Sequence, residues 1–329
     1  MPCVEGKSKY SFCINSSYYN GLLDFAKKEI NENNELKGKK INCESLKTTR
    51  TFSTSCSAKE ICKEFTLLHY YIIEHSTNKP SSGKTFSFGD CDFLNYWLND
   101  KLRKSVKEGY NIDVRGFYDE IKNKNQQFFS SNEDLEKYMK NIDPEILKNM
   151  ELLYDLYDYK QKILDMLLNQ VYSKEDNNPC SFYTDKCYEK YTTALNRCLH
   201  GHEEFYKALK DFKVGYNFSI KQDTEDIYKC RESNHFLLQK YDPVLQREKT
   251  KIMLIQGSTS FLMLILTFPL IYKFTPFGPF LQGKIKKVKN MWKSPKKNKE
   301  KMLSSSMDIG NNISDNIKYK LAYNSVTNE

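Results

Sequence analysis

The sequence lacks the motifs by which many nucleotide-binding and hydrolytic sites are recognised. It contains no G-x-x-x-x-G-K-[ST], no G-x-G-x-x-G and no G-x-S-x-G, patterns that supply the backbone geometry their chemistry requires. Its five histidines do not form H-E-x-x-H, and His200-Gly201-His202-Glu203 is better interpreted as a surface loop between helices than as a metal site. We therefore expect no enzyme activity, no catalytic residues, no cofactor and no bound metal.

Two further absences concern the cellular compartment. The residues from Met1 to Lys7 are not followed by the apolar region of a signal peptide. No C-x-x-C pair is present, which disfavours a zinc ribbon or a thioredoxin-type site. If the cysteines reach an oxidising compartment, we expect an apolar segment near the C-terminus to direct insertion itself.

The chain has ten cysteines, and all of them precede that apolar segment. An even number on one side of a membrane segment favours disulfides in an oxidising compartment. Reduced, buried cysteines are the alternative, and the spacing alone selects no pairing. The disulfide candidates are Cys3, Cys13, Cys43, Cys56, Cys62, Cys91, Cys180, Cys187, Cys198 and Cys230.

The positive charge is concentrated near the C-terminus. The chain has 51 Lys and Arg and 42 Asp and Glu, a net charge of +9. The stretch from Lys273 to Glu329 holds twelve Lys and four acidic residues, so residues 1–272 carry only +1. This distribution excludes a basic nucleic-acid-binding face on the bulk of the protein, and we expect no nucleic-acid partner.

Residues 252–272 form an uncharged apolar run of 21 residues, long enough to cross a bilayer as a helix. A buried helix of a soluble core is the alternative, but Lys249, Lys251 and Lys273 flank the run. Residues 273–293 contain six Lys and no acidic residue, whereas residues 235–251 contain four basic and two acidic residues. The positive-inside rule therefore places the tail in a cytosol and the cysteine-bearing region outside.

The segment after the apolar run, residues 273–301, is basic. Leu281, Ile285, Val288 and Trp292 recur at helical spacing and leave Lys on the other face. Such a helix is expected to lie on anionic lipids of the inner leaflet. A docking site for a cytoskeletal partner and a merely solvated basic stretch are the alternatives. The expected contacts are Lys284, Lys286, Lys287, Lys289, Trp292 and Lys293, and the Ser- and Asn-rich residues 302–329 are expected to be disordered.

Residues 1–251 predict an all-α, disulfide-stabilised helical bundle. Ser57 and Glu60 predict a capping box, Asp90 an N-cap, and Asp143-Pro144 an N-cap followed by Pro at the first helical position. The clearest helix, 144–172, has an apolar seam broken only by Gln161. The other predicted helices are 57–75, 90–106, 17–31, 112–128, 133–141, 182–199, 202–212 and 222–240. Residues 31–55, 76–90 and 173–181 predict loops, the first of them tethered by disulfides.

Several blocks resemble the Plasmodium interspersed repeat (PIR, or Vir) proteins. Cys91 to Leu102, CDFLNYWLNDKL, is similar to that family's C-x-x-L-N-Y-W-L-x-D-K-L block, and Leu153 to Tyr159 resembles its L-Y-D stretch. The stretch from Cys180 to Cys198 resembles its second cysteine cluster. The segment from Phe274 to Leu281 resembles its T-P-F-G-S-W-L motif, with Pro279-Phe280 replacing Ser-Trp, and LAYNS at 321–325 resembles its closing pattern.

The resemblance covers essentially the whole chain. It implies a variant surface antigen of a malaria parasite, exported to the infected erythrocyte and linked to antigenic variation, immune evasion and adhesion. A host surface receptor or antibody would then be the partner of the outer region. The alternative is an internal protein of host-side membranes or export compartments that acts through its basic tail.

Overall fold

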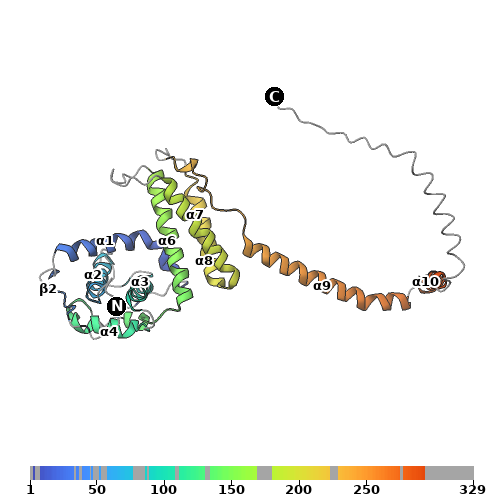
Figure 1. Cartoon of the computed structure of the whole chain (residues 1–329), viewed down its shortest axis with the longest axis horizontal. Coiled ribbons are helices and arrows are strands. Elements are labelled where there is room, and N and C mark those ends of the chain that lie inside the picture. Colours follow the sequence, from blue (N-terminus) through green and yellow to red (C-terminus); the bar gives the residue numbers. More distant parts are fainter. Residues whose placement is uncertain are drawn as a thin grey trace, which may run out of the picture. The chain divides into compact units, whose positions relative to one another are not determined.

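A computed structural model describes residues 3, 8–32, 35–36, 39–44, 46, 52, 58–76, 86, 89–107, 111–129, 134–168, 180–222, 229–274 and 277–292. It divides the chain into two compact units, Met1–Glu248 and Lys249–Glu329. Nearly all secondary structure in the described residues is helical (Figure 1), which confirms a mainly helical fold. The exception is an antiparallel pair, β1 (Glu35–Leu36) and β2 (Lys39–Lys40), in which Glu35 is opposite Lys40.

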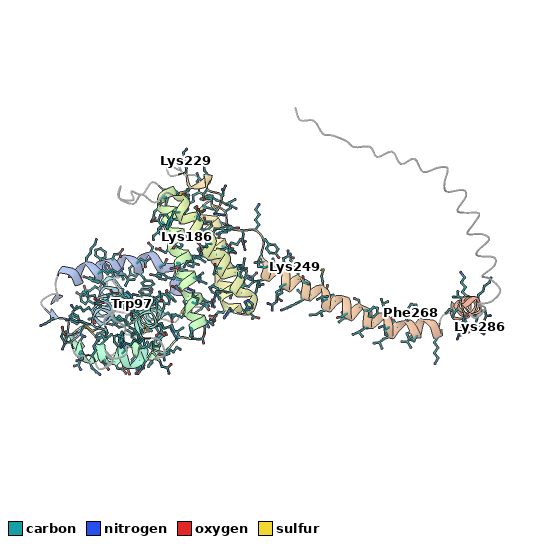
Figure 2. All side chains as sticks on the ribbon, viewed as in Figure 1. Trp97, Lys186, Lys229, Lys249, Phe268 and Lys286 are labelled. Atoms are coloured by element: carbon teal, nitrogen blue, oxygen red, sulfur yellow. A yellow bond between two sulfur atoms is a disulfide. The ribbon has the colours of Figure 1, made fainter. Side chains whose placement is uncertain are left out.

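The N-terminal half of the first unit is a group of helices around an aromatic core. The rings of Tyr19 and Phe93 stack at 3.7 Å between centroids, and Trp97 (Figure 2) is 4% exposed. Burying one such side chain contributes roughly 2–3 kcal/mol. The elements of this half are η1 (Ser11–Asn15), α1 (Ser16–Glu32), α2 (Ala58–Ser76), α3 (Asp90–Ser105), α4 (Val114–Lys124), η3 (Gln126–Phe128) and α5 (Leu135–Tyr138).

The start of α3 differs from the prediction. Asp90 is the first residue of the helix, and the N-cap position is held by Gly89 at φ 87°. A side chain at Gly89 would be strained at this φ and would approach the Phe12 backbone within 3.1 Å. The Asp90 carboxylate instead accepts a hydrogen bond from the Tyr19 hydroxyl, because both groups are buried together.

Helix α6 (Pro144–Leu167) joins the two halves of the first unit. Figure 1 shows it between the N-terminal helices and α7 (Cys180–Arg197) with α8 (Glu203–Ser219). The predicted cap is confirmed, since the Asp143 side chain accepts hydrogen bonds from two backbone N–H groups, those of Glu145 and Ile146. The seam begins as predicted, with Leu147, Met150 and Tyr154 buried, but Leu168 is 43% exposed. Further residues outside that seam are also buried because neighbouring helices cover α6 on more than one side: Leu152, Leu153, Leu156, Ile163 and Met166.

The helix predicted at 222–240 is wrong over its described part. Residues 229–242 contain only one turn of 3-10 helix, η5 (Cys230–Glu232), followed by a non-helical stretch. Phe236 and Leu238 are buried whereas Leu237 is 59% exposed, an alternation with period two that a helix would not produce. We call residues 233–242 the strap, because they run along α8 and return the chain to the start of α9 (Pro243–Phe274).

The second unit contains most of α9 and all of α10 (Phe277–Trp292). Helix α9 continues through Pro269 to Phe274, so this proline does not end it. The predicted disordered tail, 302–329, lies outside the described residues.

Candidate functional site

Among the cysteines that the structure describes, six form three disulfides that connect elements of the first unit. Cys3 is bonded to Cys91 at the start of α3, Cys43 to Cys62 in α2, and Cys180 at the start of α7 to Cys230 in η5. The bridge from Cys43 to α2 tethers the 31–55 region, as its composition predicted. Each bridge restricts the unfolded chain and thereby favours the folded one.

Three other disulfide candidates are free thiols, so the structure differs there from full pairing. Cys13, Cys187 and Cys198 are all buried, and the Cys198 thiol donates to the Ala194 carbonyl at 3.2 Å. Burial raises the pKa of Cys187 and of Cys198 to about 12 and also raises that of Cys13. These cysteines act as small apolar core residues. Cys56 lies outside the described residues.

Helix α9 is long and apolar enough, by length and composition, to cross a membrane. The apolar side chains from Ile252 to Ile271 are exposed, and Figure 2 shows side chains, Phe268 among them, projecting around the helix. Three of its hydroxyl groups donate to backbone carbonyls within the helix: Ser258 to Ile255, Thr259 to Gln256 and Thr267 to Met263. Such internal bonds reduce the cost of placing hydroxyls in an apolar medium.

Helix α10 carries the predicted basic contacts. The side chains of Lys284, Lys286, Lys287 and Lys289 are exposed, as are those of Ile285 (58%) and Val288 (51%). Trp292 is the last residue of α10, and its side chain lies outside what the structure describes, as does Lys293. The described side chains thus place four cations and two apolar residues on one short helix, in a pattern suited to a charged interface.

A groove of about 600 Å³ lies between α8 and the strap in the first unit. We call it the basic groove, because its lining, among the residues that the structure describes, contains four cationic residues and no carboxylate. Most of its apolar lining residues are buried: Ile220, Phe236 and Leu238 are each less than 8% exposed. The cationic residues are Lys213, Lys221, Arg231 and Lys240.

Hydrogen bonds fix the walls of the basic groove. The Tyr216 hydroxyl donates to the Phe236 carbonyl at 2.7 Å, and Lys213 Nζ donates to the Gln239 carbonyl at 2.8 Å. At the C-terminal end of the strap, the Tyr206 hydroxyl donates to one carboxylate oxygen of Asp242. The other oxygen accepts hydrogen bonds from the Val244 and Leu245 N–H groups in the first turn of α9. The strap is therefore held along its length against α8.

A second cavity, of about 430 Å³, lies among η1, α6 and α8. It has charges of both signs, Lys207 beside Glu204 and Asp211, around apolar side chains such as Leu153. Glu204 is already engaged by Lys9 at 3.0 Å. The mixed charge gives this cavity no preference for one class of ligand.

The histidine pair lies at a turn between helices: His200 is the last residue of η4 (Cys198–His200), and His202 precedes α8. His202 adopts φ 60° at the N-cap position of α8. Among the described residues, no group of three or more His, Cys, Asp or Glu is placed to hold a metal ion.

Sequence inspection missed the basic groove. Its four cations are spread from residue 213 to residue 240, and a helix over 222–240 would have placed the last two differently. Residues 236–238 are Phe-Leu-Leu, so the alternation of buried and exposed side chains there is not visible in the sequence.

Comparison of the chain with protein-family models, with curated proteins and with solved structures finds no match.

Proposed function

We propose that this protein is a membrane-anchored variant surface antigen of the PIR type, displayed on the infected erythrocyte in antigenic variation, immune evasion and host-cell adhesion. The observation that carries the proposal is the exposed apolar helix α9, which follows a disulfide-bonded helical unit. In this proposal α9 crosses the bilayer near the C-terminus, residues 1–251 lie outside, and α10 lies on the cytosolic face.

The blocks that carry the family resemblance support a scaffold role. In the block from Cys91 to Leu102, all but three residues are buried within α3. Leu153, Tyr154 and Leu156 of the second block are buried in α6. A core of this kind can hold the fold while surface residues change, since exposed positions tolerate substitution better than packed ones. A variant antigen requires this combination of a constant packed core and a surface that can change.

Protease accessibility on intact infected cells tests the proposal. Trypsin should remove the outer unit and leave a protected fragment that contains α9, detected with one epitope tag near each terminus. A protein resident inside the cell and an already permeabilised sample are the two controls. Full protection of the outer unit in every parasite stage would overturn surface display.

A second function is favoured by α10, with its four exposed lysines. The protein would then organise or traffic host-side membranes from within, through anionic lipids or the cytoskeleton. Replacing Lys284, Lys286, Lys287 and Lys289 with Glu should release this interaction, whereas replacing them with Arg should preserve it. Unchanged localisation and binding in the Glu variant would contradict this second function.

A further inference from the structure

We propose that the basic groove between α8 and the strap binds a linear sulfated polysaccharide. The inference deepens the adhesion role proposed above and rests on it, because the groove would meet such polysaccharides at cell surfaces and in the matrix between cells. The binding site itself is argued from charge, fixed geometry and shape within the first unit.

The charge of the groove is not a consequence of overall composition. Residues 1–272 hold 39 basic and 38 acidic residues, yet the described part of the groove lining holds four cations and no carboxylate. Lys221 and Lys240 are exposed and form no ion pair with any residue in the described ranges. Clustered like charges repel one another and favour an anionic partner.

Two of the four cations are held by hydrogen bonds to backbone carbonyls. Lys213 donates to the Gln239 carbonyl and lies 5.7 Å from the centre of the Tyr191 ring. Arg231 donates to the Gln222 carbonyl at 2.7 Å, which links η5 to the end of α8. Donors that are positioned before binding lose less conformational entropy when a ligand arrives.

The shape of the site is linear. Tyr216 of α8 bonds to Phe236 of the strap, and Lys213, earlier in α8, bonds to Gln239, later in the strap. The two segments therefore run antiparallel. Arg231 precedes the strap and Lys240 lies near its other end, which spreads the cations along the groove. The groove lining from Lys213 of α8 to Lys221 just beyond its end covers eight residues, roughly 12 Å at the rise of a helix, so a chain with repeated anionic groups fits better than a single phosphate head group.

The experiment uses the full chain in phosphatidylcholine nanodiscs, with heparin octasaccharide as the probe. Every protein carries Lys284→Gln, Lys286→Gln, Lys287→Gln and Lys289→Gln, which lowers the affinity contributed by α10 and leaves the groove unchanged. The test variant adds Lys221→Gln and Lys240→Gln. The matched control adds Lys27→Gln and Lys28→Gln, two exposed lysines of α1.

We expect the groove variant to bind the octasaccharide about tenfold more weakly, with the α1 control unchanged. Affinity should fall as salt rises, since charge interactions at an exposed site are screened. It should also rise from sulfated disaccharide to octasaccharide. Because only exposed side chains are replaced, both variants should keep the parent's circular dichroism and unfolding temperature.

Equal affinity of the groove variant and the control would overturn the proposal, as would equal binding of desulfated heparin. If the disaccharide binds as tightly as the octasaccharide and the groove substitutions weaken its binding, the groove recognises a single anionic group and not a polysaccharide chain. Equal binding of polyglutamate would assign it to an acidic peptide.

Asp223, Glu225 and Asp226 follow Gln222 in the sequence. If binding appears only after these three are replaced by their amides, the groove is occupied by the chain itself and the proposal fails. All of these measurements use purified protein, so a negative result leaves the trypsin test of surface display unaffected.

Discussion

Asn99 connects α3 to the loop that precedes α6. It is fully buried, and its Nδ2 donates to the Lys140 carbonyl at 2.9 Å while its Oδ1 accepts the Ile142 N–H at 2.8 Å. Asn95, one turn earlier, accepts the Lys140 N–H. Two buried amides therefore satisfy a backbone segment that has no helix or strand partner of its own.

Replacing Asn99 with Leu should lower the free energy of unfolding by about 2–3 kcal/mol. The leucine fills a similar volume but leaves the Lys140 and Ile142 backbone groups unsatisfied in the interior. Urea unfolding followed by circular dichroism measures the change. Asn111→Ala, at an exposed position, is the control, and a loss of comparable size there would refute the argument.

The buried thiols should resist alkylation in the folded protein. At about pH 7.5, Cys187 and Cys198 should react with iodoacetamide far more slowly than after unfolding, because they are inaccessible and their raised pKa keeps them protonated. Mass spectrometry of the labelled peptides measures the ratio. Rapid labelling of either cysteine without denaturant would contradict the described packing.

The same pKa shifts act on stability at alkaline pH. A thiol whose folded pKa lies above its unfolded value stabilises the fold most below the unfolded pKa. For Cys187 this contribution declines as the pH rises from the ordinary value of 9.0 towards about 12. Cys187→Ala should therefore flatten the fall of unfolding free energy across that interval.

At the level of single elements, the cap of α6 is the most local determinant of a boundary. Asp143→Ala should lower the unfolding free energy by about 1 kcal/mol, because two N–H groups of the first turn lose their acceptor. Asp143→Asn keeps an acceptor oxygen and should lower the unfolding free energy by only a few tenths of a kcal/mol. Thermal unfolding of the two variants in parallel distinguishes lost capping from lost charge.

Helices with strong local signals were predictable from the sequence. The Asp143-Pro144 pair and the apolar seam located α6, and the predicted 57–75 helix corresponds to α2 at Ala58–Ser76. The error at 222–240 has a long-range cause: Cys230 is bonded to Cys180, and Tyr216 and Lys213 hold the strap from α8. Partners 20 or more residues away decided its conformation, and no local pattern encodes them.

For the whole molecule, the decisive question is whether α9 resides in a bilayer. The protein should remain with the membrane after alkaline carbonate extraction. Leu262→Lys with Leu266→Lys should release it, because each central lysine opposes insertion by about 2.5–3.5 kcal/mol. Ile285→Lys with Val288→Lys adds the same charge in α10 and should leave the protein in the pellet. Retention of the α9 variant would argue against spanning.

The apolar run, the basic tail and the helical class followed from composition and periodicity. The basic groove did not, because its lining comes from the C-terminal part of α8 and the residues just after it, from η5 and from the strap. Only the fold brings Lys213 within reach of Gln239. The pairing of the cysteines was equally hidden, since three of them serve as core residues and the spacing does not distinguish these from the bonded ones.

The burial of the Cys91–Leu102 block also bears on the choice of detection reagents. Because most of that helix is packed inside the first unit, antibodies raised against a peptide of this block should label the protein on denaturing blots and fail on intact cells. Reagents for live cells should instead be raised against exposed residues of the folded unit, such as Lys210 of α8. A negative live-cell stain from a block-specific antibody therefore carries no information on whether the protein is at the surface, even when the blot is positive.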